Sequence, residues 1–274
     1  MTLSTINPNK TLWEKGDFTR LADTMRASGD DLVASLDIAL GLDVLDLGCG
    51  DGTTALPAAR RGANVLGVDI ASNLVAAGNA RALEARLTNL RFQEGDASAL
   101  DGLADQTFDL VVSMFGAMFA PRPFDTASEM VRVTRPGGRI VMGNWIPGDP
   151  TLIARILQIC AAYTAAPPEG FISPVTWGLE DTVRERFGAA GIASARITCT
   201  RATYTFRYPG APSAFLAIFR DYYGPTMNAF EAANKTGRGQ ELQSELGRLF
   251  ETQNRAGASR TEIPATYLKV VVQA

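Results

Sequence analysis

VLDLGCGDGT, residues 44–53, decides the fold of this chain of 274 residues. A short apolar run carries Asp46 near its end, and glycines follow on alternate positions at 48, 50 and 52. Glycines with this spacing let the backbone bend sharply or let a ligand come very close. The surrounding residues therefore have to indicate which ligand approaches the turn.

The composition is that of an ordinary globular protein, with 46% hydrophobic and 20% charged residues and a net charge of −3. Lys and Arg are scattered along the chain, so we expect no nucleic-acid-binding face. The chain contains no histidine, which excludes Ser-His-Asp and Cys-His hydrolases and His-ligated metal sites, and we expect no bound metal. Cys49, Cys160 and Cys199 lack the spacing of a disulfide framework and indicate reduced thiols.

The N-terminal segment lacks the apolar stretch of a secretory signal. No uncharged apolar run reaches the roughly 18 residues that a membrane span requires. The nearest run, LIARILQICAAYTAA at 152–166, is short and contains Arg155. The sequence therefore predicts a soluble, cytoplasmic protein without membrane insertion.

Between residues 42 and 145, short apolar runs alternate with amphipathic stretches. Strands that are apolar throughout and alternate with helices indicate a parallel sheet covered on both faces. The predicted fold class is therefore α/β, with a Rossmann-like, mostly parallel sheet. We expect strands at 43–47, 64–70, 90–96, 108–115 and 138–145, and helices at 53–62, 72–87 and 124–134.

Three regions are expected along the chain: an N-terminal helical cap at 1–41, the α/β core at 42–147, and residues 148–274. In the third region, strands at 196–208 and 265–274 are expected to complete a seven-stranded sheet with an antiparallel C-terminal strand. Helices near 151–165, 178–189, 211–222 and 238–255 are expected to form a lid. The helices of residues 211–255 can equally form a homodimer interface.

A dinucleotide fits the glycine turn badly. G-x-G-x-x-G starting at Gly48 needs a glycine at position 53, where Thr53 stands. Asp46 and Asp51 flank the turn and would repel a pyrophosphate, but they suit an ammonium or sulfonium centre. Asp69 lies roughly 20 residues past the first glycine, where an acidic side chain binds a ribose diol. A nucleoside with a cationic tail and no phosphate is S-adenosylmethionine.

VLDLGCGDG, Asp69, EGDA at 94–97 and FDLVVS at 108–113 resemble the class I S-adenosylmethionine-dependent methyltransferases. The wider stretch at 67–145 is similar to the type 11 small-molecule branch, near the quinone-biosynthesis methyltransferases. The resemblance is specific over about residues 42–146. A weaker similarity lies in WEKGDF at 13–18.

The resemblance implies cofactor contacts at matching positions. Asp46 is expected to support the methionine amino group, and the backbone of Gly48, Cys49 and Gly50 to pass along the methionine moiety. Asp69 is expected to bind the ribose hydroxyls. We expect Cys49 to fill space rather than to act as a nucleophile.

The resemblance also implies contacts at the two ends of the cofactor. Ile70, Asp96 and Ala97 are expected at the adenine. Asn73 is expected to reach the ribose or the adenine side. Ser113 and Met114, at the end of the fourth strand, are expected to border the methyl group and the substrate.

The apolar stretch SMFGAMFAP at 113–121 follows the strand end where a substrate has to approach. Phe115, Met118 and Trp145 are therefore candidates for the substrate pocket, and no catalytic residue is assigned. Methyl transfer requires mainly alignment and exclusion of water, so acceptors that need no strong base are favoured. We expect a small, partly hydrophobic acceptor, with O-, N- or C-methylation undetermined.

Two alternatives stay open on the sequence alone. The first is a scaffold that binds S-adenosylmethionine without methyl transfer, for which a blocked or solvent-filled space beside Ser113 and Phe115 would argue. The second is a nicotinamide-dependent oxidoreductase. Thr53, the carboxylates around the turn and the lack of a Tyr-x-x-x-Lys pair in the core disfavour it.

Overall fold

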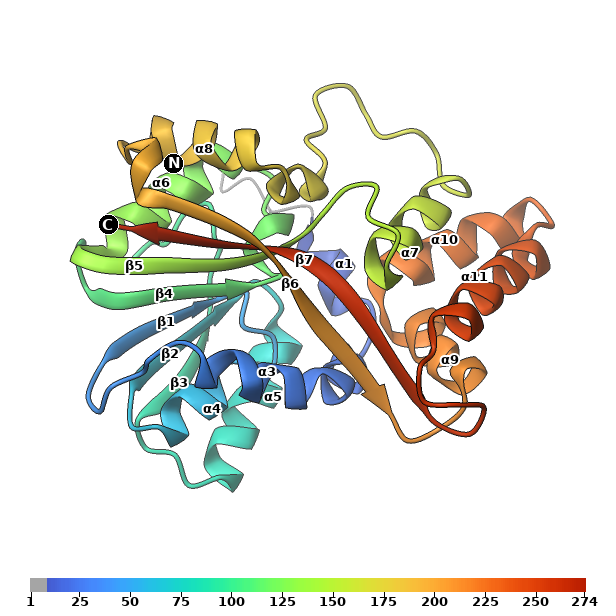
Figure 1. Cartoon of the computed structure of the whole chain (residues 1–274), viewed down its shortest axis with the longest axis horizontal. Coiled ribbons are helices and arrows are strands. Elements are labelled where there is room, and N and C mark those ends of the chain that lie inside the picture. Colours follow the sequence, from blue (N-terminus) through green and yellow to red (C-terminus); the bar gives the residue numbers. More distant parts are fainter. Residues whose placement is uncertain (1–8) are drawn as a thin grey trace.

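The computed structural model describes residues 9–274. Its centre is a seven-stranded sheet in the order β3-β2-β1-β4-β5-β7-β6, with helices on both faces (Figure 1). The sequence-based prediction of a Rossmann-like sheet is confirmed. The strands are β1 (Asp43–Leu47), β2 (Asn64–Asp69), β3 (Leu90–Glu94), β4 (Phe108–Met114), β5 (Thr134–Trp145), β6 (Ile197–Tyr208) and β7 (Thr261–Gln273).

The first five strands are parallel. Leu45 at the centre of β1 pairs with Leu66 on β2 and with Val111 on β4, and all three side chains are buried. These strands are apolar throughout because helices cover both of their faces. Their carboxyl ends meet at one edge of the sheet, where the loops after β1, β2, β3 and β4 come together.

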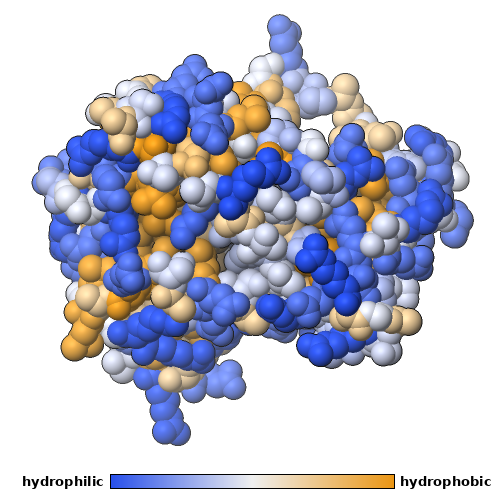
Figure 2. All heavy atoms as spheres, in the orientation of Figure 1, coloured by the Kyte–Doolittle hydropathy of each residue, from blue (hydrophilic) through white to orange (hydrophobic). Residues whose placement is uncertain are grey.

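Helices α6 (Pro123–Val133) and α8 (Glu180–Ala189) lie on one face of the sheet. Helices α3 (Arg26–Ala34), α4 (Ala55–Arg60) and α5 (Ser72–Glu84) lie on the other (Figure 1). Each face has its own cluster of buried apolar side chains. On the face shown in Figure 2, hydrophilic side chains cover most of the helices, with smaller hydrophobic groups between them.

The two C-terminal strands form a long antiparallel ribbon, with β7 between β5 and β6. Their pairing runs from Ile197 opposite Val272 to Tyr208 opposite Thr261, well past the point where β5 ends. A helical unit lies at the far end of this ribbon (Figure 1). It consists of α7 (Leu152–Ala161), α9 (Pro212–Tyr222), α10 (Gly224–Lys235) and α11 (Gly239–Gln253).

Helix α10 has no counterpart among the expected helices. Its first turn contains Gly224 and Pro225, two residue types that are unfavourable inside a helix. Proline is tolerated there because the first N–H groups of a helix have no partner within the helix.

The N-terminal segment crosses the carboxyl edge of the sheet as α1 (Asn9–Glu14), α2 (Thr19–Ala22) and a 3₁₀ turn, Asp23–Met25, which leads into α3. Residues 1–8 of the expected cap lie outside the described residues. No helix within residues 9–274 is long and apolar enough to cross a membrane.

Candidate active site

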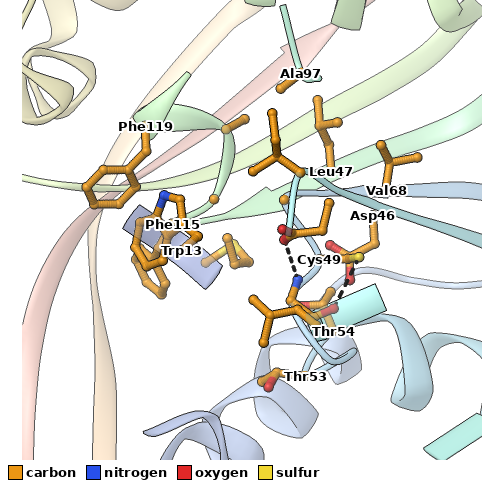
Figure 3. Close-up of a pocket in the computed structure, with 18 of the residues that line it drawn as sticks. Trp13, Asp46, Leu47, Cys49, Thr53, Thr54, Val68, Ala97, Phe115 and Phe119 are labelled. Carbon is orange, nitrogen blue, oxygen red and sulfur yellow. Dashed lines mark hydrogen bonds between the residues drawn. The ribbon is translucent and has the colours of Figure 1, made fainter. Parts of the chain in front are cut away.

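A cavity opens at the carboxyl edge of the parallel strands, and the N-terminal segment forms part of its wall (Figure 3). It encloses about 970 Å³, its open mouth included. Its wall comes from the loops after β1, β2, β3 and β4, from the N-terminal segment, and from β6. Ligands of open α/β sheets bind at this edge.

The glycine turn after β1 forms the floor of the cavity. Gly48, Gly50 and Gly52 have φ angles of 68°, 54° and 91°, a left-handed conformation that glycine adopts without strain. The backbone N–H of Gly48 donates to the carbonyl oxygen of Val68 at 2.7 Å. The turn is therefore fixed against the end of β2.

Asp46 is a buried carboxyl at the cavity wall, and its Oδ2 atom has no hydrogen-bond partner among the described residues. Burial raises the pKa of Asp46 to about 8, while the N–H of Ala55 lowers it and the charge of Asp69 raises it further. An unpaired buried carboxylate is costly, so this atom is suited to a cationic group of a ligand. The ammonium group of S-adenosylmethionine fits it.

Asp69, at the end of β2, connects two loops. Its carboxylate accepts hydrogen bonds from the N–H of Gly50 at 2.8 Å and from the N–H of Ala71 at 2.9 Å. Burial raises the pKa of Asp69, and these N–H groups act in the opposite direction. The side chain thus holds the glycine turn in place and lies in the cavity wall.

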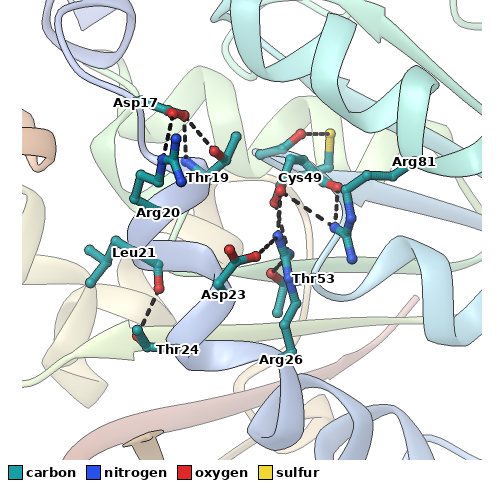
Figure 4. A network of polar contacts seen from close by, with 12 residues as sticks. Asp17, Thr19, Arg20, Leu21, Asp23, Thr24, Arg26, Cys49, Thr53 and Arg81 are labelled. Carbon is teal, nitrogen blue, oxygen red and sulfur yellow. Dashed lines mark hydrogen bonds and ion pairs between the residues drawn. The ribbon is translucent and has the colours of Figure 1, made fainter. Parts of the chain in front are cut away.

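Asp51 differs from the expectation, because it does not add negative charge to the cavity. Arg26 from α3 forms an ion pair with its carboxylate, with 2.8 Å between Nη1 and Oδ1. Nη1 of Arg81 on α5 lies 3.5 Å from Oδ2; both arginines are visible in Figure 4. Tertiary contacts neutralise Asp51, so the argument that Asp51 attracts a cation is wrong.

Most of the expected cofactor residues do line the cavity. Those in the wall are Asp46, Gly48, Cys49, Gly50, Asp69, Ile70, Ala97 and Met114. Burial raises the pKa of the Cys49 thiol well above its usual range, so the side chain is a buried neutral thiol.

Asn73, Asp96 and Ser113 are not part of the wall. Asn73 donates to the carbonyl oxygen of Gly16 at 3.4 Å, and Asp96 accepts from the N–H of Ser98 at 2.8 Å. Ser113 is fully buried. Its hydroxyl donates to the carbonyl oxygen of Leu47 at 2.6 Å and accepts from the N–H of Ala117 at 2.9 Å. The expectation that its side chain borders the methyl group is therefore corrected: it joins β4 to β1.

Of the three substrate-pocket candidates, only Phe115 lines the cavity. Met118 and Trp145 are buried behind it, which corrects the expectation for both. The Trp145 ring stacks on the Phe115 ring at 3.7 Å between centroids, with 6° between the planes. Phe115 has a φ of 64°, which is strained for an aromatic residue and is typical of functional sites.

The aromatic end of the cavity includes residues that the sequence did not assign. Trp13 and Phe18 come from the N-terminal segment and Phe119 from the 3₁₀ turn Ala117–Phe119. The Trp13 ring lies 4.9 Å from that of Phe119 and 5.8 Å from that of Phe18, between centroids. In Figure 3, Trp13, Phe115 and Phe119 gather on the side away from Asp46 and Val68. WEKGDF at 13–18 was the available signal for the first two.

The helices α9–α11 contribute none of the described wall residues, so the expected helical lid is not their role at this cavity. The N-terminal segment covers it instead. Glu14 of α1 accepts from the N–H of Ser72 at 3.0 Å and from its hydroxyl at 2.6 Å. Lys15 forms a 2.7 Å ion pair with Glu231 of α10. The helical unit therefore helps to hold the N-terminal segment in place over the cavity.

The fold, the cavity and the sequence together define a class I S-adenosylmethionine-dependent methyltransferase, and the chain belongs to this family. Residues 45–142 match the family model described as a methyltransferase domain. The chain is 35% identical over 225 residues to an uncharacterized protein of Mycobacterium tuberculosis, Rv1403c, across 82% of this chain and 80% of that protein. It is thus an enzyme that uses S-adenosylmethionine for methyl transfer.

Two further similarities cover less of the sequence or concern the fold alone. Demethylmenaquinone methyltransferase of Shouchella clausii is 37% identical over 114 residues, which are 40% of this chain and 48% of that enzyme. The crystal structure of YcgJ from Bacillus subtilis shares the fold with a TM-score of 0.58 at 18% identity. That match covers 90% of this chain and 98% of YcgJ.

Proposed function

We propose that the enzyme transfers the methyl group of S-adenosylmethionine to a small, partly hydrophobic, planar acceptor. The observation that carries this proposal is the division of one cavity into two chemically different parts. Asp46 and Asp69 line it at the carboxyl ends of β1 and β2. Trp13, Phe115 and Phe119 line it on the side away from Asp46 (Figure 3). Such a cavity suits a polar donor beside an apolar acceptor.

In this proposal, the carboxylate of Asp46 binds the methionine ammonium group, and Asp69 binds the ribose hydroxyls. Gly48, Cys49 and Gly50 lie along the methionine moiety because their backbone leaves room for it. Residues at the ends of the cofactor are Ile70 and Ala97 at the adenine and Met114 near the methyl group. Asn73 and Asp96 lie outside the wall, and their hydrogen bonds hold the segments that carry Ile70 and Ala97.

The bound cofactor supplies a methyl group activated by a sulfonium leaving group. The chain aligns the acceptor with that group and excludes water, and positioning of this kind contributes up to ~7–11 kcal/mol. The titratable groups in the described wall are Asp46, Cys49, Asp51, Asp69 and Tyr204. Of these, Tyr204 packs against the aromatic end, with its ring 5.1 Å from that of Phe115 between centroids, and its hydroxyl is hydrogen-bonded to the carbonyl oxygen of Met25. We therefore expect the acceptor to bring its own nucleophile: an acidified phenol, an amine, or a carbon activated by a neighbouring oxygen.

Similarity to demethylmenaquinone methyltransferase over part of the chain supports a planar, quinone-like acceptor. The aromatic side chains of the wall, Trp13, Phe115 and Phe119, support it independently, because aromatic rings favour offset or edge contacts with other rings. We also propose that the enzyme acts in the cytoplasm on a small molecule rather than on nucleic acid. A homodimer through α9–α11 is a separate proposal, which light scattering after gel filtration tests.

The test begins with titration calorimetry of the full chain with S-adenosylmethionine, S-adenosylhomocysteine and NADH. We expect micromolar binding of the first two, and its loss in Asp69→Ala but not in Asp101→Ala, an exposed control. Transfer of labelled methyl to an anionic hydroxynaphthoquinone and to simple phenols follows. Binding of NADH alone would contradict the proposal, and cofactor binding without transfer to any acceptor would favour a scaffold.

A further inference from the structure

The cofactor carries an anionic group for which the proposal above assigns no partner. The α-carbon of methionine bears both an ammonium and a carboxylate group. If the ammonium group binds Asp46, the carboxylate lies only a few ångströms from it. Asp46 and Asp69 would repel this carboxylate, so nearby groups of the wall have to donate hydrogen bonds to it.

Thr53 offers a hydroxyl proton at this point. Nη1 of Arg26 donates to Oγ1 of Thr53 and to the carboxylate of Asp51 (Figure 4). A guanidinium group only donates hydrogen bonds, so the Thr53 oxygen is the acceptor and its proton is left to donate. The described residues provide no acceptor for that proton. Thr53 lines the cavity, so a ligand oxygen can accept it.

Tyr204 offers a second donor. Its hydroxyl donates to the carbonyl oxygen of Met25 at 3.3 Å, which is long compared with about 2.7–2.8 Å for a good O–H···O bond. Burial raises the pKa of Tyr204, and Asp46 is among the charges that raise it further. The phenol therefore keeps its proton, and it lines the same cavity as Asp46.

The two side chains meet at one point of α3. A Cβ on Gly29 would lie 2.6 Å from Cγ2 of Thr53 and 3.2 Å from the hydroxyl oxygen of Tyr204. Both side chains therefore pack against Gly29, whose lack of a side chain leaves room for them. The turn after β1 and the distant strand β6 thus bring the side chains of Thr53 and Tyr204 to the same part of the cavity wall.

We propose that Thr53 and Tyr204 are positioning residues that hold the carboxylate of the methionine moiety, with the charge of Arg26 acting through Thr53. This inference rests on the proposed function, which places the ammonium group at Asp46. Holding both charged groups fixes the orientation of the methionine moiety and hence the direction of the methyl group. The enzyme should consequently select S-adenosylmethionine over its decarboxylated form, which has the same sulfonium and ammonium groups but no carboxylate.

The experiment is titration calorimetry of the full chain with these two ligands. We expect the wild type to prefer S-adenosylmethionine by at least about tenfold, as charge-assisted hydrogen bonds imply. Tyr204→Phe should weaken S-adenosylmethionine binding by about tenfold and leave the decarboxylated ligand unaffected. Thr53→Val should behave in the same way, whereas Thr53→Ser, which keeps the hydroxyl, should restore the preference.

Tyr208→Phe is the matched control, since Tyr208 lies on the same strand but outside the cavity wall. Thermal melts confirm that each variant folds. Equal affinity of the wild type for both ligands, or equal weakening of both by Tyr204→Phe, would overturn this assignment alone. If the wild type does not bind S-adenosylmethionine at all, the proposed function is overturned together with this assignment.

Discussion

Gly48 and Gly116 lie backbone against backbone. A Cβ on Gly116 would lie 2.4 Å from the carbonyl oxygen of Gly48 and 2.6 Å from its Cα. The loops after β1 and β4 therefore meet without an intervening side chain. The hydroxyl of Ser113 holds the same junction through Leu47 and Ala117. This contact fixes the floor of the cavity relative to Phe115, the residue next to Gly116.

Gly116→Ala tests the closeness of that contact. The added methyl group would force one loop to move, and we expect the free energy of unfolding to fall by about 1–3 kcal/mol and cofactor binding to weaken. Gly188→Ala in α8 is the control, because its Cβ would meet no atom within 4 Å. That change should stabilise the helix by roughly 0.5–1 kcal/mol. Equal stability of the two variants in urea unfolding would contradict the contact.

Phe115→Gly and Phe115→Ala test the backbone strain at φ 64°. Both variants lose the stacking on Trp145, and both should raise KM for the acceptor. Only glycine adopts this conformation freely, so Phe115→Gly should be more stable than Phe115→Ala by about 1 kcal/mol. At an ordinary position the order is reversed, which makes the comparison of urea midpoints decisive.

Asp46→Asn tests the buried carboxyl. Its pKa of about 8 in the folded protein lies above the ordinary 3.8, so the folded state binds the proton more tightly than the unfolded state. The stability that this proton contributes is present at low pH and is lost as the pH rises towards about 8. Asp46→Asn should therefore melt at a higher temperature than the wild type above about pH 8, with a smaller difference near pH 4.

The same variant should lose cofactor binding. In the wild type, a cation at Asp46 displaces the proton, so binding below about pH 7 should release close to one proton. Calorimetry in two buffers of different ionisation enthalpy measures this release. A wild-type enzyme that binds S-adenosylmethionine without releasing a proton would contradict an ammonium contact at Asp46.

Glu14→Ala tests the attachment of the N-terminal segment. Glu14 accepts two hydrogen bonds from Ser72 at the start of α5, much as a capping side chain does, and its loss should cost about 1 kcal/mol. Hydrogen exchange should accelerate in residues 9–22, and cofactor affinity should fall several-fold. Lys15→Ala removes a surface ion pair with Glu231 and a hydrogen bond to Asn228, both exposed, and should change stability by less than about 1 kcal/mol.

The sequence predicted the sheet well because its strands are short apolar runs with turn residues on both sides. Asp46 and Asp69 could be assigned because each sits at a strand end with a defined spacing. The neutralisation of Asp51 by Arg26 and Arg81 could not, since those contacts join segments 25 and 30 residues apart. The place of Tyr204 in the cavity wall could not be predicted for the same reason. Alternation along β6 indicates on which face of the sheet a side chain lies, but not which residues pack against it.

Burial depth was the second limit. Met118 and Ser113 are close in sequence to residues of the cavity wall, and Trp145 stacks on one of them, Phe115, but all three side chains are buried behind the wall. Apolar character predicts that a side chain is buried, and it does so equally for the wall of a pocket and for the core behind it. Only the packed arrangement separates Phe115 from Trp145, although the two rings touch.

The β6–β7 ribbon carries α9–α11 beyond the sheet, and none of the described wall residues belongs to these helices. They reach the cavity indirectly, through Tyr223, whose ring lies 6.0 Å from that of Trp13 between centroids. A change in the length or packing of α9–α11 would therefore alter the N-terminal segment that covers the aromatic end of the cavity. It would leave Asp46 and Asp69, at the methyl-donor end, unchanged.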